Sequence, residues 1–362
     1  MKRRLKYRFM TIKYYDIRDD LKLYPDAWAY LIWSKRGPGK TYSTLRLMLE
    51  EKKKFLFMKR TIEDVKTLCA NGGKRGVEFD ISPFKPLNRD FGYNIKPVLI
   101  VKGIAGFYEC NEGGEPAGAP IGYCGALSAA RDIKGFDMSE VDYQIFDEFI
   151  PKRGERISRT EGEQLLDIYM TLRRDRLERG REDLKLICLA NAESVNNPTF
   201  QTFDVVDLAV QMDIDNREYT YLEDRGIMLH KIPPVEGLPV KKNGIEAAMA
   251  GTPWADMAFG GSFAFDDFTS VKRQRMKGFK PICAYIYRNK QVFVYNNGGV
   301  WYLSRSKADV KDVYDLKREN EQKRFYYDYV DRIRDACIVD RCKFEDFTMY
   351  DLIVNYRKIF QI

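Results

Sequence analysis

The stretch LIWSKRGPGKTYS, residues 31–43, carries residues whose types and spacing fit the binding of a nucleoside triphosphate. The usual phosphate-binding pattern is Gly-x-x-x-x-Gly-Lys-Ser/Thr: backbone N–H groups surround the phosphates, the lysine reaches the β and γ oxygens, and the hydroxyl binds Mg²⁺. Gly39, Lys40 and Thr41 match its end, and Ser34 replaces the first glycine, which we expect to be tolerated if φ stays negative there. Gly-Lys-Thr also occurs by chance in ordinary loops. The residues expected to bind nucleotide are Ser34, Lys35, Arg36, Gly37, Pro38, Gly39, Lys40 and Thr41.

Two acids close a second apolar segment, in the stretch VDYQIFDEFIP. Residues 143–146 have the composition of a buried strand, and Asp147 and Glu148 follow it, which is the pattern of a Walker B strand. We expect Asp147 to hold the magnesium and Glu148 to polarise the attacking water. The alternative is a solvated pair of acids at a strand end.

Polar residues at two further places are candidates for the same chemistry. Asn191 ends the apolar stretch LKLICLAN, where it is placed to sense the γ-phosphate or to hold the water, although a turn or helix N-cap is an equally plausible role. An arginine cluster lies on the helix predicted for residues 161–180, which precedes this stretch. It is either a solvated face or the source of an arginine finger for a neighbouring subunit. Its members are Arg173, Arg174, Arg176 and Arg179.

The predicted elements give these residues an α/β context. Residues 27–33 favour a strand, residues 41–54 an amphipathic helix and residues 55–60 a second strand, which is the order of a βαβ unit. After residue 232 the chain becomes rich in proline and glycine, and from Lys280 it has the pattern of antiparallel strands. We therefore predict a P-loop ATPase domain at 1–232, a connector at 233–267 and a second domain at 268–362.

Composition excludes several classes of protein. The chain has 362 residues, seven scattered cysteines with no C-x-x-C, and a single histidine, His230, so a zinc site or a histidine-dependent hydrolase is not expected. Its apolar runs are too short for a membrane span, and the basic N-terminus lacks the apolar core of a signal peptide. The net charge of +8 favours a polyanionic partner.

Four stretches in this order, SKRGPGKTYS, IFDEFIP, TLRRDR and ICLANAESVNNPTF, resemble the DNA-packaging ATPases of small podoviruses, the phi29-like motors related to terminase large subunits. The resemblance covers roughly residues 27–210 and returns at KFEDFTMYDLIVNYRKIF. It implies an ASCE-type (RecA-like) ATPase whose active-site set is Lys40, Thr41, Asp147, Glu148 and Asn191. It also implies a trans-acting arginine at Arg174, with Arg173 and Arg176 as competitors, and a trans-acting lysine at Lys134.

The resemblance further implies a pentameric ring at the portal vertex that uses ATP and Mg²⁺ to drive double-stranded DNA into an empty capsid. The implied partners are DNA, the portal protein, and a structural packaging RNA in some motors; the location is the host cytoplasm, without a membrane. The second domain is expected to be a vestigial RNase H-like fold. Since residues 268–308 contain no Asp or Glu, a two-metal nuclease site lacks its first-strand acid. Instead, this segment contains basic side chains that could contact phosphates: Lys272, Arg273, Arg275, Lys277 and Lys280.

The leading hypothesis is thus an ATP-driven translocase of viral DNA. Lys59 and Arg60, at the end of the second predicted strand, are candidates for contacts in the pore or the site. A helicase or AAA-like remodeller would share the ATP site. A third hypothesis is a non-hydrolysing nucleotide-dependent binding module in which Ser34 marks a decayed loop. DNA-stimulated ATP turnover separates this module from the two enzymes.

Overall fold

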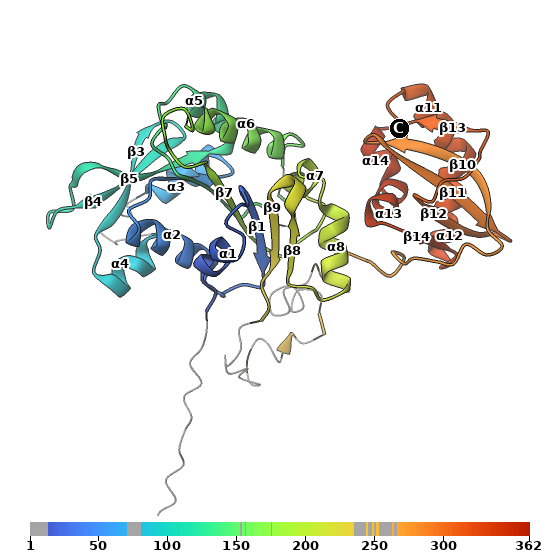
Figure 1. The fold of residues 1–362 in the computed structure, drawn as a ribbon, viewed down its shortest axis with the longest axis horizontal. Helices are drawn as coiled ribbons and strands as arrows, with labels where there is room; N and C mark the ends of the chain where they lie inside the picture. The colour runs from blue at the N-terminus through green and yellow to red at the C-terminus, as the bar shows by residue number, and fades with distance from the viewer. Residues whose placement is uncertain are drawn as a thin grey trace, which may run out of the picture. The chain divides into compact units, whose positions relative to one another are not determined.

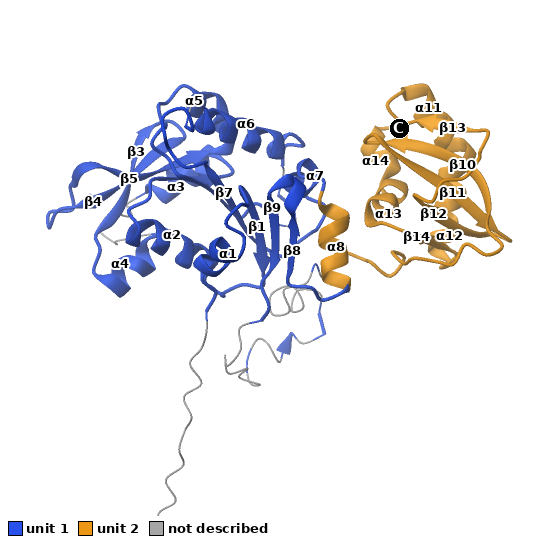
Figure 2. Ribbon diagram, in the orientation of Figure 1, with its two compact units in different colours: residues 1–204, 215–265 blue, residues 205–214, 266–362 orange. Residues whose placement is uncertain are grey.

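The chain forms two compact units, one of residues 1–204 and 215–265 and one of residues 205–214 and 266–362 (Figure 2). The computed structural model describes residues 14–70, 81–234 except 153, 156 and 175, and 266–362, with a few residues between 235 and 265. Residues 1–13, in which no signal peptide is expected, and most of the connector expected at 233–267 lie outside the described residues.

The first unit is built on a nine-stranded, mainly parallel sheet with the order β3-β4-β5-β2-β6-β7-β1-β9-β8 (Figure 1). Strand β7 lies between β1 and β6 and is parallel to both, so one strand separates the phosphate-loop strand from the acid strand, as in ASCE ATPases. The predicted first and second strands are present as β1 and β2. They do not pair directly, however, because β6 and β7 are inserted between them. The strands are β1 (Ala29–Ser34), β2 (Phe55–Lys59), β3 (Ile95–Val101), β4 (Ile104–Cys110), β5 (Pro116–Ala126), β6 (Tyr143–Asp147), β7 (Lys185–Asn191), β8 (Tyr219–Leu222) and β9 (Ile227–Lys231).

Helices cover both faces of this sheet (Figure 1). All six residues of β1 are buried, as a central parallel strand requires, and alternate side chains enter opposite layers. Tyr30 and Ile32 join the core under α1 to α4, whereas Trp33 packs edge-on against Phe200 of α7 at 5.4 Å between ring centroids. The helices are α1 (Ile17–Leu23), α2 (Lys40–Glu50), α3 (Ile62–Leu68), α4 (Lys85–Phe91), α5 (Ala130–Lys134), α6 (Glu161–Arg173) and α7 (Pro198–Thr202).

The second unit has a five-stranded sheet of order β13-β10-β11-β12-β14. Strands β10, β11 and β12 form an antiparallel meander, and β13 lies parallel to β10, as at the start of an RNase H-like sheet. The short β14 lies parallel to β12 at the other edge. The strands are β10 (Lys280–Tyr287), β11 (Lys290–Asn297), β12 (Val300–Ser304), β13 (Val313–Asp315) and β14 (Cys342–Phe344).

Helix α8 (Val206–Ile214) belongs to this second unit although it is flanked in sequence by the first. Its Asp207 accepts hydrogen bonds from the backbone N–H and the hydroxyl of Thr348, both at 2.8 Å, and from Arg305 at 3.1 Å. No sequence pattern around α8 indicates this grouping. The other helices are α11 (Glu319–Phe325), α12 (Asp331–Ile338), α13 (Phe347–Val354) and α14 (Tyr356–Phe360), with the π-helical turn Tyr326–Val330 between α11 and α12.

Candidate active site

The carboxyl ends of β1, β6 and β7 meet at one edge of the first sheet, the edge at which parallel α/β sheets bind their ligands. A cavity of about 230 Å³ opens there. Side chains at or just after these three strand ends converge on it, although β1 and β6 are more than 100 positions apart in the sequence. Its lining consists of Gly37, Pro38, Gly39, Lys40, Thr41, Tyr42, Asp147, Glu148, Ala190 and Asn191.

The phosphate loop turns through two glycines in left-handed conformations, Gly37 at φ +91° and Gly39 at φ +95°. A Cβ at either position would meet no atom within 4 Å, so the requirement for glycine is conformational and not steric. Helix α2 begins directly afterwards, and Gly39 offers its first turn no side-chain cap. The loop and the helix N-terminus therefore leave backbone N–H groups available to an anion such as a phosphate.

Ser34, the substitute for the first glycine, does not enter the left-handed region. Its hydroxyl donates to the carbonyl of Lys35 at 2.6 Å and accepts from Lys40 Nζ at 2.6 Å. A glycine could make neither bond, so the serine is integrated in the loop. Three of the residues expected to bind nucleotide, Ser34, Lys35 and Arg36, do not line the cavity. The guanidinium of Arg36 instead lies 3.7 Å from the carboxylate of Glu193.

Lys40 is the central cation of the cavity, and its side chain is buried. Its Nζ also donates to Asn191 Oδ1 and to the carbonyl of Lys35, each at 3.3 Å. Burial lowers the pKa of Lys40 to about 8, and the carboxylate of Asp147 partly opposes this. The lysine is thus in contact with the asparagine that is expected to sense the γ-phosphate.

The ligands proposed for magnesium also lie side by side. Thr41 Oγ1 donates to Asp147 Oδ1 at 2.9 Å. Within the described ranges, no group of three or more His, Cys, Asp or Glu side chains is placed to bind a metal. One hydroxyl and one carboxylate fit Mg²⁺, which keeps several waters and is usually shared with substrate phosphates, better than an ion held by protein alone.

Glu148 adopts φ +60°, an unusual conformation for a non-glycine residue and one that is frequent where function requires it. Two lysines flank its carboxylate, Lys152 at 3.3 Å and Lys59 at 4.0 Å. Lys59 also contacts Asp147 Oδ2 at 2.9 Å. Burial lowers the pKa of Lys59, but the charge and hydrogen bond of Asp147 outweigh this and raise it overall. Lys59, a candidate from the sequence for contacts in the pore or the site, therefore contacts both acids of the candidate site.

Arg60 holds the backbone of the same segment. Its guanidinium donates to the carbonyls of Glu148 at 2.9 Å and Phe149 at 3.3 Å, and it pairs with Glu161 at 2.7 Å. Glu161 is buried in the first turn of α6, and burial raises its pKa although Arg60 opposes the shift. No local sequence signal identifies this clamp, because it joins residues about 90 to 100 positions apart.

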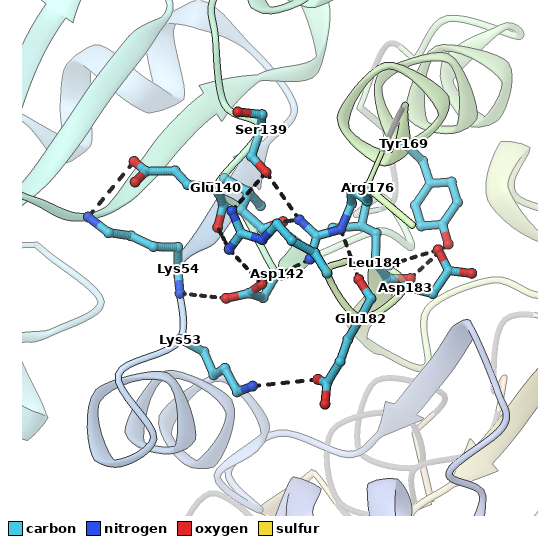
Figure 3. A network of polar contacts seen from close by, with 12 residues as sticks. Lys53, Lys54, Ser139, Glu140, Asp142, Tyr169, Arg176, Glu182, Asp183 and Leu184 are labelled. Atoms are coloured by element: carbon cyan, nitrogen blue, oxygen red, sulfur yellow. Dashed lines mark hydrogen bonds and ion pairs between the residues drawn. The ribbon is translucent and has the colours of Figure 1, made fainter. Parts of the chain in front are cut away.

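The arginine cluster separates into residues with different surroundings. Arg176 is 1% exposed and sits in a polar network in which it donates to the carbonyls of Ser139, Val141 and Glu182 and pairs with Asp142 at 2.9 Å (Figure 3). Arg173 pairs with Asp183 at 2.7 Å. These two arginines stabilise the fold around α6 and are already engaged within the subunit.

Arg174, in contrast, is exposed directly after α6 and makes none of the ion pairs found among the described residues. It lines a hollow of about 500 Å³ together with Arg173, Arg176 and Lys134. The Nζ of Lys134 contacts Asp167 at 2.8 Å. This hollow shares no lining residue with the cavity around Lys40. The structure thus brings the two predicted trans-acting residues together and keeps them apart from the predicted cis-acting set.

The chain is similar to known proteins in sequence and in fold. Residues 106–334 match the family model described as podovirus DNA encapsidation protein (Gp16). The DNA packaging protein of Bacillus phage B103 is 24% identical over 273 residues, which are 74% of this chain and 71% of that protein.

Two solved structures share the fold over nearly the whole chain. One is a chain of the bacteriophage phi-29 genome packaging motor assembly, with a TM-score of 0.63 and 17% identity, covering 96% of this chain and 99% of that chain. The other is the phi-28 gp11 DNA packaging motor, with a TM-score of 0.53 and 18% identity over 93% and 95%. In the part of the chain that the structure describes, no helix is long and apolar enough to cross a bilayer.

Proposed function

Since the chain belongs to the podovirus DNA encapsidation protein family and is a phage genome-packaging motor protein, we propose that it hydrolyses ATP in the cavity around Lys40 and uses the energy to move double-stranded viral DNA into a preformed capsid. The observation that carries this proposal is the convergence of Lys40, Asp147 and Asn191, from three strand ends, on one cavity. The family supports ATPase activity in general for this chain.

Within one subunit each residue has a distinct role in this proposal. The loop N–H groups and Lys40 bind the β- and γ-phosphates, and Thr41 with Asp147 holds Mg²⁺, which neutralises phosphate charge when bound. Glu148 lines the cavity and orients the attacking water. Asn191 reports whether the γ-phosphate is present, since it already accepts a hydrogen bond from Lys40.

The neighbouring subunit completes the site with Arg174 and Lys134. Arg173 and Arg176 line the same hollow as Arg174 and Lys134. The support for choosing Arg174 is therefore its exposure, together with the ion pairs that hold Arg173 to Asp183 and Arg176 to Asp142. A cation that arrives from a neighbour stabilises charge that develops on the transferred phosphoryl group and makes hydrolysis depend on assembly. A homo-oligomeric ring, a pentamer by the family resemblance, provides this geometry.

The second unit is proposed to bind nucleic acid or the portal without cutting DNA. Strands β10 to β12 carry no Asp or Glu, and the five basic residues between 272 and 280 are all exposed. The motor is proposed to act in the host cytoplasm at the portal vertex, with DNA and the portal protein as its partners. A structural packaging RNA is a third partner in some motors of the family that the chain resembles.

The test is ATP turnover by the assembled full-length chain with and without DNA. We expect stimulation by DNA in the wild type and loss of turnover in both Lys40→Ala and Arg174→Ala. Arg173→Ala is the matched control, because Arg173 already pairs with Asp183, and it should retain stimulation. Mixing Arg174→Ala with Lys40→Ala subunits should restore part of the activity if Arg174 acts in trans. Wild-type protein without DNA-dependent turnover would refute the motor function.

A further inference from the structure

A hydrogen bond from outside the phosphate loop holds its turn. The carbonyl of Pro38, the residue between the two left-handed glycines, accepts from the backbone N–H of Tyr15 at 3.1 Å. Tyr15 lies just before α1, whose N-cap is Asp16. Since Gly37 and Gly39 give the loop access to many backbone conformations, an external bond at Pro38 restricts which of them is populated.

The side chain of Tyr15 is itself fixed by a buried polar cluster. Its hydroxyl donates to Asp20 Oδ2 at 2.8 Å, and His230 Nδ1 contacts the same oxygen at 2.8 Å. Asp20 is fully buried, His230 is 3% exposed, and the ring of Tyr219 stacks on that of His230 at 4.1 Å between centroids. The cluster thus joins α1 to β8 and β9, and through the backbone of Tyr15 it reaches the loop.

This cluster lies next to the strand from which the loop emerges. His230 is in register with Ile32 of β1, two residues before Ser34, and the N–H of Ile232 donates to the carbonyl of Trp33 at 2.9 Å. Strand β9 therefore pairs with β1, from which the loop emerges, and also carries His230 of the cluster that fixes Tyr15.

Packing alone does not account for the choice of residues. Asp20 Oδ1 and His230 Nε2 are both buried without a hydrogen-bond partner in the described structure. Burying such atoms is costly, and apolar residues of similar size would often be at least as stable. A directional polar cluster does what an apolar one cannot, because it fixes one arrangement of the chain.

We propose that Tyr15, Asp20 and His230 are positioning residues that hold the phosphate-binding loop in its nucleotide-ready conformation through the Tyr15–Pro38 hydrogen bond. The inference rests on the proposed nucleotide site, and none of the three residues lines the cavity. A preformed loop binds phosphate equally in the ground state and the transition state. Loss of the support should therefore weaken nucleotide binding and leave turnover at saturating ATP nearly unchanged.

The test compares Tyr15→Phe with Tyr123→Phe in the full-length chain. Both substitutions remove one 2.8 Å hydrogen bond from a tyrosine hydroxyl to a carboxylate, but Tyr123 on β5 bonds to Glu140, away from the loop. The measurements are the Kd of a fluorescent ADP analogue, kcat and KM for ATP, the Tm, and hydrogen exchange in the loop segment.

Tyr15→Phe keeps the backbone N–H that donates to Pro38 but loses the hydroxyl bond that fixes Tyr15 to Asp20. We expect it to raise Kd and KM by up to about tenfold, the upper limit set by one hydrogen bond, with kcat within about twofold and faster exchange in the loop. Tyr123→Phe should lower the Tm at most comparably and leave Kd unchanged. Unchanged Kd in Tyr15→Phe, or an equal rise in Tyr123→Phe, overturns the positioning role while leaving the proposed function intact. Absence of nucleotide binding by the wild type would instead overturn the proposed function.

Discussion

Lys40 should destabilise the nucleotide-free protein, so replacing it with methionine should stabilise the fold while abolishing nucleotide binding. The ammonium is held in a buried position where its pKa falls from the ordinary 10.5 to about 8. At about 1.36 kcal/mol per pKa unit, this difference corresponds to a cost of about 3 kcal/mol at neutral pH. Methionine fills similar space without a charge to desolvate.

Part of this gain is lost through the partners of the ammonium. Ser34 loses the donor at 2.6 Å, and Asn191 and the carbonyl of Lys35 each lose one at 3.3 Å. Ser34 still donates to the carbonyl of Lys35, and Asn191 is only partly buried, so we assign about 1 kcal/mol to the three losses together. The net expectation for Lys40→Met is about 2 kcal/mol of stabilisation, or a rise in Tm on the order of 4–8 °C for a unit of this size.

The stability difference between Lys40→Met and wild type should depend on pH, whereas a difference caused by packing alone should not. Below about pH 8 the lysine is protonated in both the folded and the unfolded chain, and the folded state bears the full cost. Between pH 8 and 10.5 the folded chain holds a neutral lysine, so the cost shrinks as pH rises and disappears above the unfolded pKa of 10.5. The advantage of Lys40→Met should therefore be largest at pH 7 and fall by about 2 kcal/mol at pH 9.5.

The assay is denaturant unfolding of Lys40→Met and wild type at pH 7 and 9.5, without nucleotide. Lys35→Met, a neighbouring loop lysine that is only partly buried, serves as the matched control and should change stability little. A destabilised Lys40→Met, or a stabilisation that does not depend on pH, would show that the buried charge of Lys40 does not destabilise the fold.

Three further predictions concern the rest of the site. Arg176→Ala should cost about 3 kcal/mol, because it removes a buried cation whose hydrogen bonds to the carbonyls of Val141 and Glu182 are then lost, while Ser139 keeps Arg181 as a donor. Arg174→Ala should leave the Tm unchanged, and thermal unfolding of both variants decides this. Glu148→Gln should retain binding of a fluorescent ATP analogue and lower turnover by about 10² to 10⁴, and a turnover near wild type would exclude Glu148 as the group that orients water. A chelator should abolish turnover without changing the Tm of the nucleotide-free protein, since the described chain holds no metal cluster of its own; a large fall in Tm would contradict this.

The grouping of the residues proposed to act in cis around one cavity is largely predictable from the sequence, because its signals are local. A strand followed by glycines, lysine and threonine, and a strand followed by two acids, each report where a side chain stands at a strand end. Parallel strands bring those ends together, so the sequence alone predicts that Lys40 and Asp147 lie near each other. The order of the strands, and with it the insertion of β6 and β7 between β1 and β2, is not predictable in this way, because it depends on pairing between distant segments.

Contacts between distant side chains are likewise beyond reasoning from spacing. Arg60 clamps Glu148 and Glu161, and His230 meets Asp20 across 210 positions; no spacing rule connects such pairs. The arginine cluster shows the same limit. Helix α6 ends at Arg173, so the helical period that would rank the following arginines no longer applies to them.

Excluding a site from a sequence requires less information than assigning a role to a residue. The lack of Asp and Glu from residue 268 to residue 308 needs no geometry, since a strand cannot present a carboxylate that it does not contain, and β10 to β12 do lie within this segment. Ser34 requires the opposite kind of knowledge. As a mismatch to a pattern it is compatible with a decayed loop. Its two 2.6 Å hydrogen bonds, one of them to the lysine of the pattern, show that the serine is bonded within the loop, which favours a functional loop over a decayed one.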